Sequence, residues 1–270
     1  MTLIFTRMKR CCFTTKSHYD KIYILRIKRV IFGIVLGLSI LAFVNSFKEE
    51  NHLFILSGQS NMVNLNPNLS FTPLVNKEFG EENVTVIKEA HEGKAIRNWF
   101  KYWEFNQNSN KKSSGVLYDS LIKKVLNVYN KKEYSSVTLV WMQGESDAKE
   151  EASNMYEANI RGLVYQLSKD LNRLDINCVI GRLSDYGFYD EDYVDWHKIR
   201  KIQLALGLAD PRNTWVNTDD LNDGLDAQGN IVKNDFHYTV EGYQTLGERF
   251  AVKSIKVIKK NNSLLKLISF

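Results

Sequence analysis

After residue 50 the chain alternates between short apolar segments, typical of buried strands, and longer segments with helical spacing of apolar residues. The strand-like segments are HLFIL (52–56), NVTVIKEA (83–90), SSVTLVWMQG (135–144), NCVIGRLS (177–184) and TWVNTDDL (214–221). The helix-like segments cover residues 116–130, 151–171, 192–209 and 239–258. This alternation predicts a parallel sheet flanked by helices.

The 270 residues, 44% of them hydrophobic and 3 of them proline, suit one packed α/β domain with a short appendage. The net charge of +5 arises at the amino-terminal end, where residues 1–47 hold 8 Lys or Arg and one acidic residue, Asp20. The other residues carry 28 basic and 30 acidic side chains, a net charge of about −2. The body therefore lacks the basic surface that nucleic acid requires, and we expect no nucleic-acid partner.

The amino-terminal segment has the pattern of an export signal. RIKR (26–29) precedes VIFGIVLGLSILAFV (30–44), an uncharged run of 15 residues, whereas a membrane-spanning helix needs roughly 20. The VNS sequence ending at Ser46 favours cleavage by a signal peptidase, while the long basic region favours an uncleaved membrane anchor. A buried core helix is the third interpretation. We expect a leader over residues 1–46, a single domain over 47–270, and an extracytoplasmic location: secreted, periplasmic or membrane-anchored and facing outward.

The cysteines offer no disulfide framework within the body. Cys11 and Cys12 lie in the leader, which leaves Cys178 alone in the body. No Cys/His spacing indicates zinc. We expect Cys178 to be a small buried strand residue.

Polar clusters follow the predicted strands: SGQSN, HEGKA, QGESD, LSDYG and DDLNDG. In an open parallel sheet, ligands bind at the carboxyl ends of the strands. Because these clusters converge on one edge of the sheet, the sequence predicts an active site there.

Ser60 in SGQSNM is the first candidate nucleophile. Gly58 permits a tight turn after the strand, and Ser60 would lie at the start of the next helix, where free N–H groups stabilise an oxyanion. A helix N-cap is an equally good interpretation of this serine. The segment is not the G-x-S-x-G nucleophile elbow, because Met62 replaces the second glycine.

Two further clusters contain suitable partners. His237 precedes the last helix, and Asp235 lies two residues earlier, on the same side of an extended segment. Taken alone, a histidine and an aspartate at this spacing more often lie on a surface loop without a catalytic role. In WMQGESD, the Gln143 amide could point into the cleft, while Glu145 and Asp147 could bind a metal or hold the loop by hydrogen bonds.

Together, GQSNM, QGESD and D-x-H before a terminal LG-x-R helix resemble the SGNH hydrolase superfamily. More narrowly they resemble its sialate O-acetylesterase-like branch, which includes carbohydrate esterase family 6 acetylxylan esterases. The resemblance covers residues 52 to about 252. It implies a three-layer α/β/α sandwich with a mostly parallel, roughly five-stranded, flavodoxin-like sheet.

The resemblance also implies an exported serine esterase that removes O-acetyl groups from carbohydrates and needs no cofactor and no metal. Ser60 would be the nucleophile, His237 the general base and Asp235 the orienting acid. The oxyanion hole would combine the backbone N–H of Ser60, the N–H of Gly93 and the side chain of Gln143. An acetylated carbohydrate, such as sialic acid, xylan or another glycan, would be the substrate.

The sequence departs from the family pattern in two places. Relatives often have Gly-Gly-Thr-x-Ile-x-x-Trp where this chain has EGKAIRNW (92–99), so Glu92 replaces the first glycine. A non-glycine residue can still offer its N–H there if its backbone angles allow it. Some relatives place the acid three residues before the histidine, where this chain has Asn234; Asp220 and Asp223 are reserve candidates.

Two other functions remain open at this point. The chain could be a catalytically inactive glycan-binding module on the same fold, which Glu92 alone favours. It could also be a membrane-anchored surface protein whose tail KKNNSLLKLISF contacts lipid or a partner, although a frayed helix end explains this tail more simply. Five aromatic residues could stack on sugars, and ordinary packing is expected for at least half of them: Trp99, Trp103, Tyr186, Tyr189 and Trp196.

Overall fold

The computed structural model describes residues 28–34, 50–101, 115–187 and 193–268, with the backbone alone for 263–268. Its main sheet has five parallel strands: β1 (His52–Gly58), β2 (Val84–Ala90), β3 (Ser136–Met142), β4 (Asn177–Gly181) and β5 (Asn213–Val216). Their order is β2-β1-β3-β4-β5, the order of flavodoxin-like sheets. The predicted parallel sheet is confirmed.

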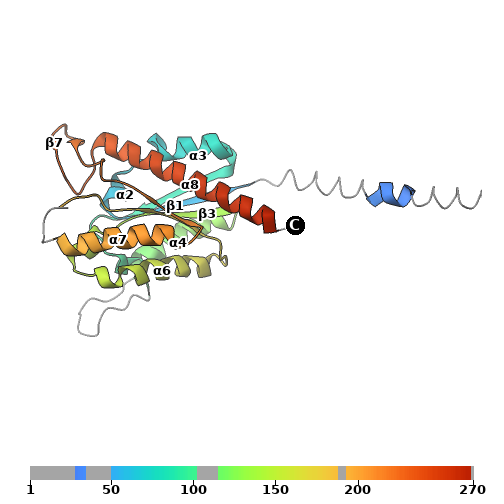
Figure 1. The fold of residues 1–270 in the computed structure, drawn as a ribbon, viewed down its shortest axis with the longest axis horizontal. Coiled ribbons are helices and arrows are strands. Elements are labelled where there is room, and N and C mark those ends of the chain that lie inside the picture. Colours follow the sequence, from blue (N-terminus) through green and yellow to red (C-terminus); the bar gives the residue numbers. More distant parts are fainter. Residues whose placement is uncertain (1–27, 35–49, 102–114, 188–192, 269–270) are drawn as a thin grey trace, which may run out of the picture. The chain divides into compact units, whose positions relative to one another are not determined.

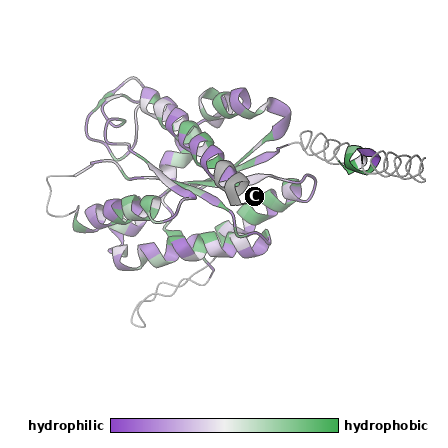
Figure 2. Ribbon diagram, turned by 45° about the vertical axis from the view of Figure 1, so that its right-hand side comes forward, coloured by the Kyte–Doolittle hydropathy of each residue, from purple (hydrophilic) through white to green (hydrophobic). Residues whose placement is uncertain are grey.

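Helices cover both faces of this sheet (Figure 1). On one face lie α3 (Phe71–Phe79) and α8 (Val240–Ile268), which pack against each other. On the other face lie α4 (Val116–Tyr129), α6 (Ser153–Asp170) and α7 (Val194–Leu208). These helices alternate hydrophobic and hydrophilic residues (Figure 2), as helices that bury one face against a sheet do. The predicted three-layer α/β/α sandwich is therefore confirmed.

The core is centred on β1 and β3, whose residues are buried along their whole length. A parallel strand covered by helices on both faces excludes water from both sets of side chains, so apolar residues run continuously rather than alternating. Trp141 of β3 packs edge-on against Trp99, with ring centroids 5.3 Å apart. Cys178 in β4 is buried, as predicted.

Several boundaries differ from the prediction. Strand β5 ends at Val216, not at 221, because the following aspartates turn away to bind arginines. Helix α8 continues to Ile268, so the predicted end at 258 was too early. Helix α3 and the antiparallel pair β6 (Gly224–Leu225) and β7 (Ile231–Val232) were not predicted, since α3 is short and each of these strands has two residues.

Most of the predicted leader lies outside the described residues. Residues 28–34 form a helix, and residues 50–270 belong to a separate compact unit. In the part of the chain that the structure describes, no helix combines the length and the apolar character needed to span a bilayer. The boundary at residue 46 and the cleavage of the leader stay predictions.

Candidate active site

The turn after β1 positions Ser60. Gly58 has φ +145°, and a Cβ there would lie 1.8 Å from the carbonyl oxygen of Met142, so only glycine fits. The Gln59 N–H donates to the same carbonyl oxygen over 2.9 Å. Helix α2 (Ser60–Asn64) then begins, with Gln59 at its N-cap. Ser60 is thus the first helical residue, and the N-cap interpretation was wrong.

The Ser60 hydroxyl meets the ring of His237, which comes from the loop before α8. Ser60 Oγ lies 3.0 Å from His237 Nε2 although 177 residues separate them. Burial is the main cause that lowers the pKa of His237, and nearby Lys149 lowers it further, while Asp235 and Glu92 act in the opposite direction. A lowered pKa keeps the imidazole neutral near pH 7, in the form that accepts a proton.

Asp235 binds the backbone of His237 and not its ring. Its Oδ1 accepts a hydrogen bond from the His237 N–H at 2.8 Å. Among the described residues, no carboxylate is hydrogen-bonded to the His237 ring. Of the reserve candidates, Asp223 accepts from the Asn234 N–H and Asp220 forms a bidentate pair with an arginine of α8. Asp235 therefore acts on His237 through loop conformation and charge.

Gln143 does not point a free amide into the cleft as predicted. Its side chain is fully buried, and Nε2 lies 2.6 Å from Asp147 Oδ2, 3.1 Å from the Lys94 carbonyl oxygen and 3.2 Å from Gln59 Oε1. An amide has two protons, so these three acceptors leave none for a substrate. The predicted donor role of Gln143 is corrected to a positioning role.

The QGESD segment fixes the loop that carries Ser60. Gln59 Oε1 accepts from the Ser146 N–H at 3.1 Å, and Asn61 Nδ2 donates to Glu145 Oε1 at 2.8 Å. Asn61 also accepts from the Tyr243 hydroxyl at 2.9 Å, a contact that the sequence pattern gave no means of finding. Of the two roles predicted for Glu145, the structure supports loop-holding.

The same segment also holds the HEGKA loop. Asp147 Oδ2 accepts from the Ile96 N–H at 2.9 Å, two residues after Lys94, whose carbonyl oxygen Gln143 binds. Burial raises the pKa of Asp147 to about 6 and that of Glu145 to about 7. Within the described residues, no group of three or more His, Cys, Asp or Glu side chains could hold a metal ion.

Glu92, which stands where relatives often have a glycine, does not strain the backbone of the HEGKA loop. Among the described residues other than glycine, only three have a positive φ, and Glu92 is not one of them. Gly93 itself has φ +60° and is exposed. In the described part of the chain, the N–H groups of Ser60 and Gly93 donate to no other group, so both are available to a ligand.

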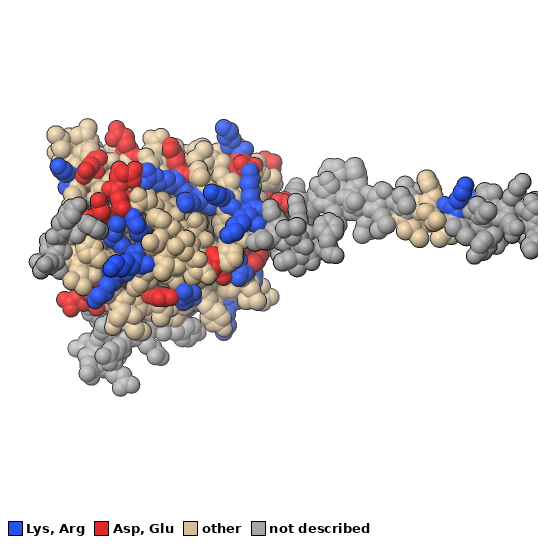
Figure 3. Space-filling model, in the orientation of Figure 1, with Lys and Arg blue, Asp and Glu red and all other residues tan. Residues whose placement is uncertain are grey.

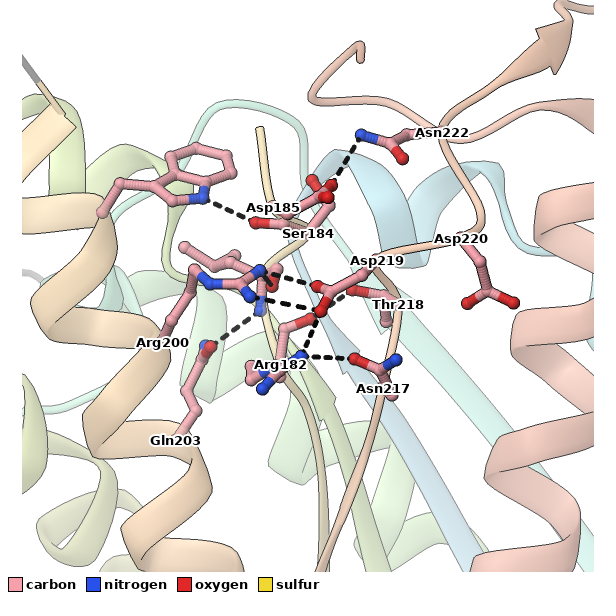
Figure 4. A network of polar contacts seen from close by, with 12 residues as sticks. Arg182, Ser184, Asp185, Arg200, Gln203, Asn217, Thr218, Asp219, Asp220 and Asn222 are labelled. Atoms are coloured by element: carbon pink, nitrogen blue, oxygen red, sulfur yellow. Dashed lines mark hydrogen bonds and ion pairs between the residues drawn. The ribbon is translucent and has the colours of Figure 1, made fainter. Parts of the chain in front are cut away.

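A buried polar network ties the loops after β4 and β5 together (Figure 4). Arg200 of α7 donates to the Leu183 carbonyl oxygen at 2.6 Å and to Asp219 Oδ1 at 2.8 Å, and Arg182 binds the same carboxylate. Asn222 then donates to the Asp235 carbonyl oxygen at 3.0 Å. The network thus reaches the loop that carries His237.

The aromatic candidates mostly serve packing. Trp99 and Trp196 are buried, and Trp196 Nε1 donates to the Ser184 carbonyl oxygen at 2.8 Å. Trp103 and Tyr189 lie outside the described residues. Tyr186 is half-buried and packs edge-on against Phe236, whose ring lies 4.2 Å from that of His237.

Residues 63–256 match the family model described as carbohydrate esterase, sialic acid-specific acetylesterase. The chain belongs to this family. It is therefore a carboxylic-ester hydrolase, and the predicted membership of the sialate O-acetylesterase-like branch is confirmed. A search of curated proteins found no matching sequence.

Solved structures of similar proteins share the fold of this carbohydrate esterase. A protein from Arabidopsis thaliana is 19% identical, with a TM-score of 0.55 over 77% of this chain and 98% of its own. A carbohydrate acetylesterase from Xanthomonas citri is 16% identical, with a TM-score of 0.55 over 77% of this chain and 56% of its own; this chain thus spans just over half of that one. NanS is 10% identical, with a TM-score of 0.53 over 78% of this chain and 98% of its own.

Proposed function

We propose that this carbohydrate esterase removes O-acetyl groups from glycans, with Ser60 as the nucleophile and His237 as the general base. The observation that carries the proposal is the 3.0 Å contact between Ser60 Oγ and His237 Nε2. A nucleophile and its base must lie within hydrogen-bond reach. Family membership and the similarity to the Xanthomonas citri carbohydrate acetylesterase favour an acetyl ester.

In the first step, His237 Nε2 takes the Ser60 proton as Oγ attacks the ester carbonyl carbon. The N–H groups of Ser60 and Gly93 would donate to the resulting oxyanion. His237 then donates its proton to the oxygen of the leaving sugar alcohol. Water, activated by the same imidazole, releases acetate from Ser60.

Asp235 supports the imidazole in this proposal. Its bond to the His237 N–H sets the loop, and its charge opposes the effect of burial on the pKa of His237. The imidazolium that forms during each step is stabilised by this nearby negative charge. Asp235 thus completes a Ser-His-Asp set without a carboxylate bond to the ring.

We further propose that the enzyme acts outside the cytoplasm. The basic RIKR segment and the uncharged run of 15 residues that follows it support export. A polymeric acetylated glycan of a cell envelope or of the surroundings suits such a location. The intact mass of the protein recovered outside the cell would test cleavage near residue 46.

Hydrolysis of a chromogenic acetyl ester tests the catalytic proposal directly. The wild type should be active, and Ser60→Ala and His237→Ala should both fall to near background. Asp220→Asn serves as a matched control, because this exposed carboxylate pairs with Arg249 and does not bind the histidine loop. Activity retained by Ser60→Ala would rule out the nucleophile, and an inert wild type that binds acetylated glycans would indicate a binding module.

A further inference from the structure

A pocket of about 520 Å³ opens beside His237. Four parts of the chain surround it. They are the end of α2 and the residues that follow it up to Ser70, the β6–β7 hairpin, the loop that carries His237 (the histidine loop), and the first turns of α8. Figure 1 shows this hairpin close to the start of α8. Both His237 and Asp235 line the pocket, so any molecule bound there lies next to the proposed general base.

The direction of proton transfer identifies what this pocket receives. In the proposed reaction, His237 protonates the oxygen of the leaving alcohol, so the sugar must lie within reach of the imidazole. The acetyl carbonyl instead faces the N–H groups of Ser60 and Gly93. The pocket beside His237 is therefore on the leaving-group side of the scissile bond.

Uncharged hydrogen-bonding groups outnumber the charged residues of the pocket lining. Asn64, Asn66, Gln228 and Gln244 contribute amides, and Tyr243 contributes a phenol. Amides and hydroxyls both donate and accept hydrogen bonds, which matches the hydroxyl groups of a sugar. The lining thus has the chemistry of a carbohydrate subsite.

The fixed charge of the pocket is negative. Among its lining residues, all of which the structure describes, none is Lys or Arg, whereas Asp226 and Asp235 contribute carboxylates. Hydrogen bonds from Asn230 hold the pKa of Asp226 below its usual value, so this group stays ionised. Figure 3 shows several acidic side chains near the hairpin corner, with basic side chains beside them.

We propose that this pocket binds the sugar of an uncharged acetylated glycan and excludes sugars that carry a carboxylate. This inference rests on the proposed esterase function and adds the substrate class. A sugar carboxylate would meet Asp226 and Asp235 without a cation to pair with. Lys149, whose charge lowers the pKa of His237, lies over the Phe236 ring at 4.6 Å and does not line the pocket.

The test compares three acetyl esters on the full chain: 4-nitrophenyl acetate, acetylated xylo-oligosaccharides and O-acetylated sialic acid. The wild type should show a kcat/KM for the neutral oligosaccharide at least about fivefold above that for the sialic acid, the effect of one unit charge close to another at the protein surface. Gln244→Lys, which adds a cation to the lining, should reduce this preference through a lower KM for the sialic acid. Gln244→Met, of similar length and no charge, should preserve it, and so should Lys149→Gln.

Three results would overturn the inference. The first is that the wild type hydrolyses the sialic acid ester as well as the neutral oligosaccharide, or better. The second is that Lys149→Gln loses activity on the sialic acid ester. The third is that Gln244→Lys keeps the preference of the wild type for the neutral oligosaccharide. In each case hydrolysis of 4-nitrophenyl acetate would show that the esterase function stands. A wild type inert on all three esters would instead refute the proposed function, and this inference with it.

Discussion

Glu145 makes the stability of this esterase depend on pH in an unusual direction. Its side chain is buried, Oε1 accepts from Asn61, and Oε2 has no hydrogen-bond partner among the described residues. Burial raises its pKa from 4.5 to about 7. Between these two values the folded state binds more protons than the unfolded state, so the free energy of unfolding falls as the pH rises.

The size of the effect follows from the two pKa values. The difference between about 7 and 4.5, at about 1.4 kcal/mol for each pH unit, corresponds to about 3 kcal/mol. This stabilisation is fully present below pH 4.5 and is lost as the pH passes through 7. In Glu145→Gln the amide oxygen can still accept a hydrogen bond from Asn61, but there is no carboxyl group to ionise. The pH-dependent contribution of this residue to the free energy of unfolding therefore disappears.

Urea unfolding of the full chain at several pH values between 5 and 8.5 measures this contribution. The stability of the wild type should fall more steeply with pH than that of Glu145→Gln, by about 3 kcal/mol over the range. The comparison uses slopes because the new amide N–H2 is buried without a partner, which lowers stability equally at every pH. Asp220→Asn is the control, because Arg249 lowers the pKa of that exposed carboxylate below 3.8, so it stays ionised throughout this range and its loss should leave the slope unchanged. Parallel curves for the wild type and Glu145→Gln would refute a raised pKa at Glu145.

Three other predictions concern the site and its support. Lys149→Gln should raise the pKa of His237 and move the acidic limb of the kcat/KM profile to higher pH, whereas Glu92→Gln should move it to lower pH; shifts in the same direction would contradict the charge arrangement. Gly58→Ala should destabilise the fold by roughly 3 kcal/mol or more in urea unfolding, because its Cβ would overlap a carbonyl oxygen of β3. Arg200→Leu should cost roughly 2 kcal/mol and lower kcat/KM together, since the Leu183 carbonyl oxygen loses its donor and Asp219 keeps only its pair with Arg182; full activity would show that the network does not position the histidine loop.

The fold could be predicted because its signals are local and repeated. Each central strand is a continuous apolar run, as in the 52–56 segment, and each long helix has its own apolar periodicity. The β6–β7 hairpin escaped prediction because strands of two residues leave no period to detect. The residues of this hairpin that line the pocket, such as Gln228 and Val232, were therefore not identified from the sequence.

The residues of the site could be predicted from the sequence, but their hydrogen bonds could not. The sequence placed Ser60 and His237 at one sheet edge, and the structure brings them to 3.0 Å. Which atom Asp235 binds depends on loop backbone angles, and the positive φ of Asn234 just before it has no pattern in the sequence. Gln143 was assigned to the cleft because it ends a strand, but its contacts with Gln59 and the Lys94 carbonyl oxygen only exist once distant loops meet.

These contacts show that the two motifs that mark the family have different roles. SGQSN carries the proposed nucleophile, while QGESD binds the SGQSN loop through Gln59 and Asn61 and the HEGKA loop through Ile96. Because one buried segment sets both the nucleophile and the proposed oxyanion donor, a change within QGESD must alter their separation and the stability of the fold together. A change at His237, which is half-buried and lines the pocket, alters proton transfer with far less effect on packing. The ratio of lost activity to lost stability therefore distinguishes a positioning residue from a catalytic one in this fold.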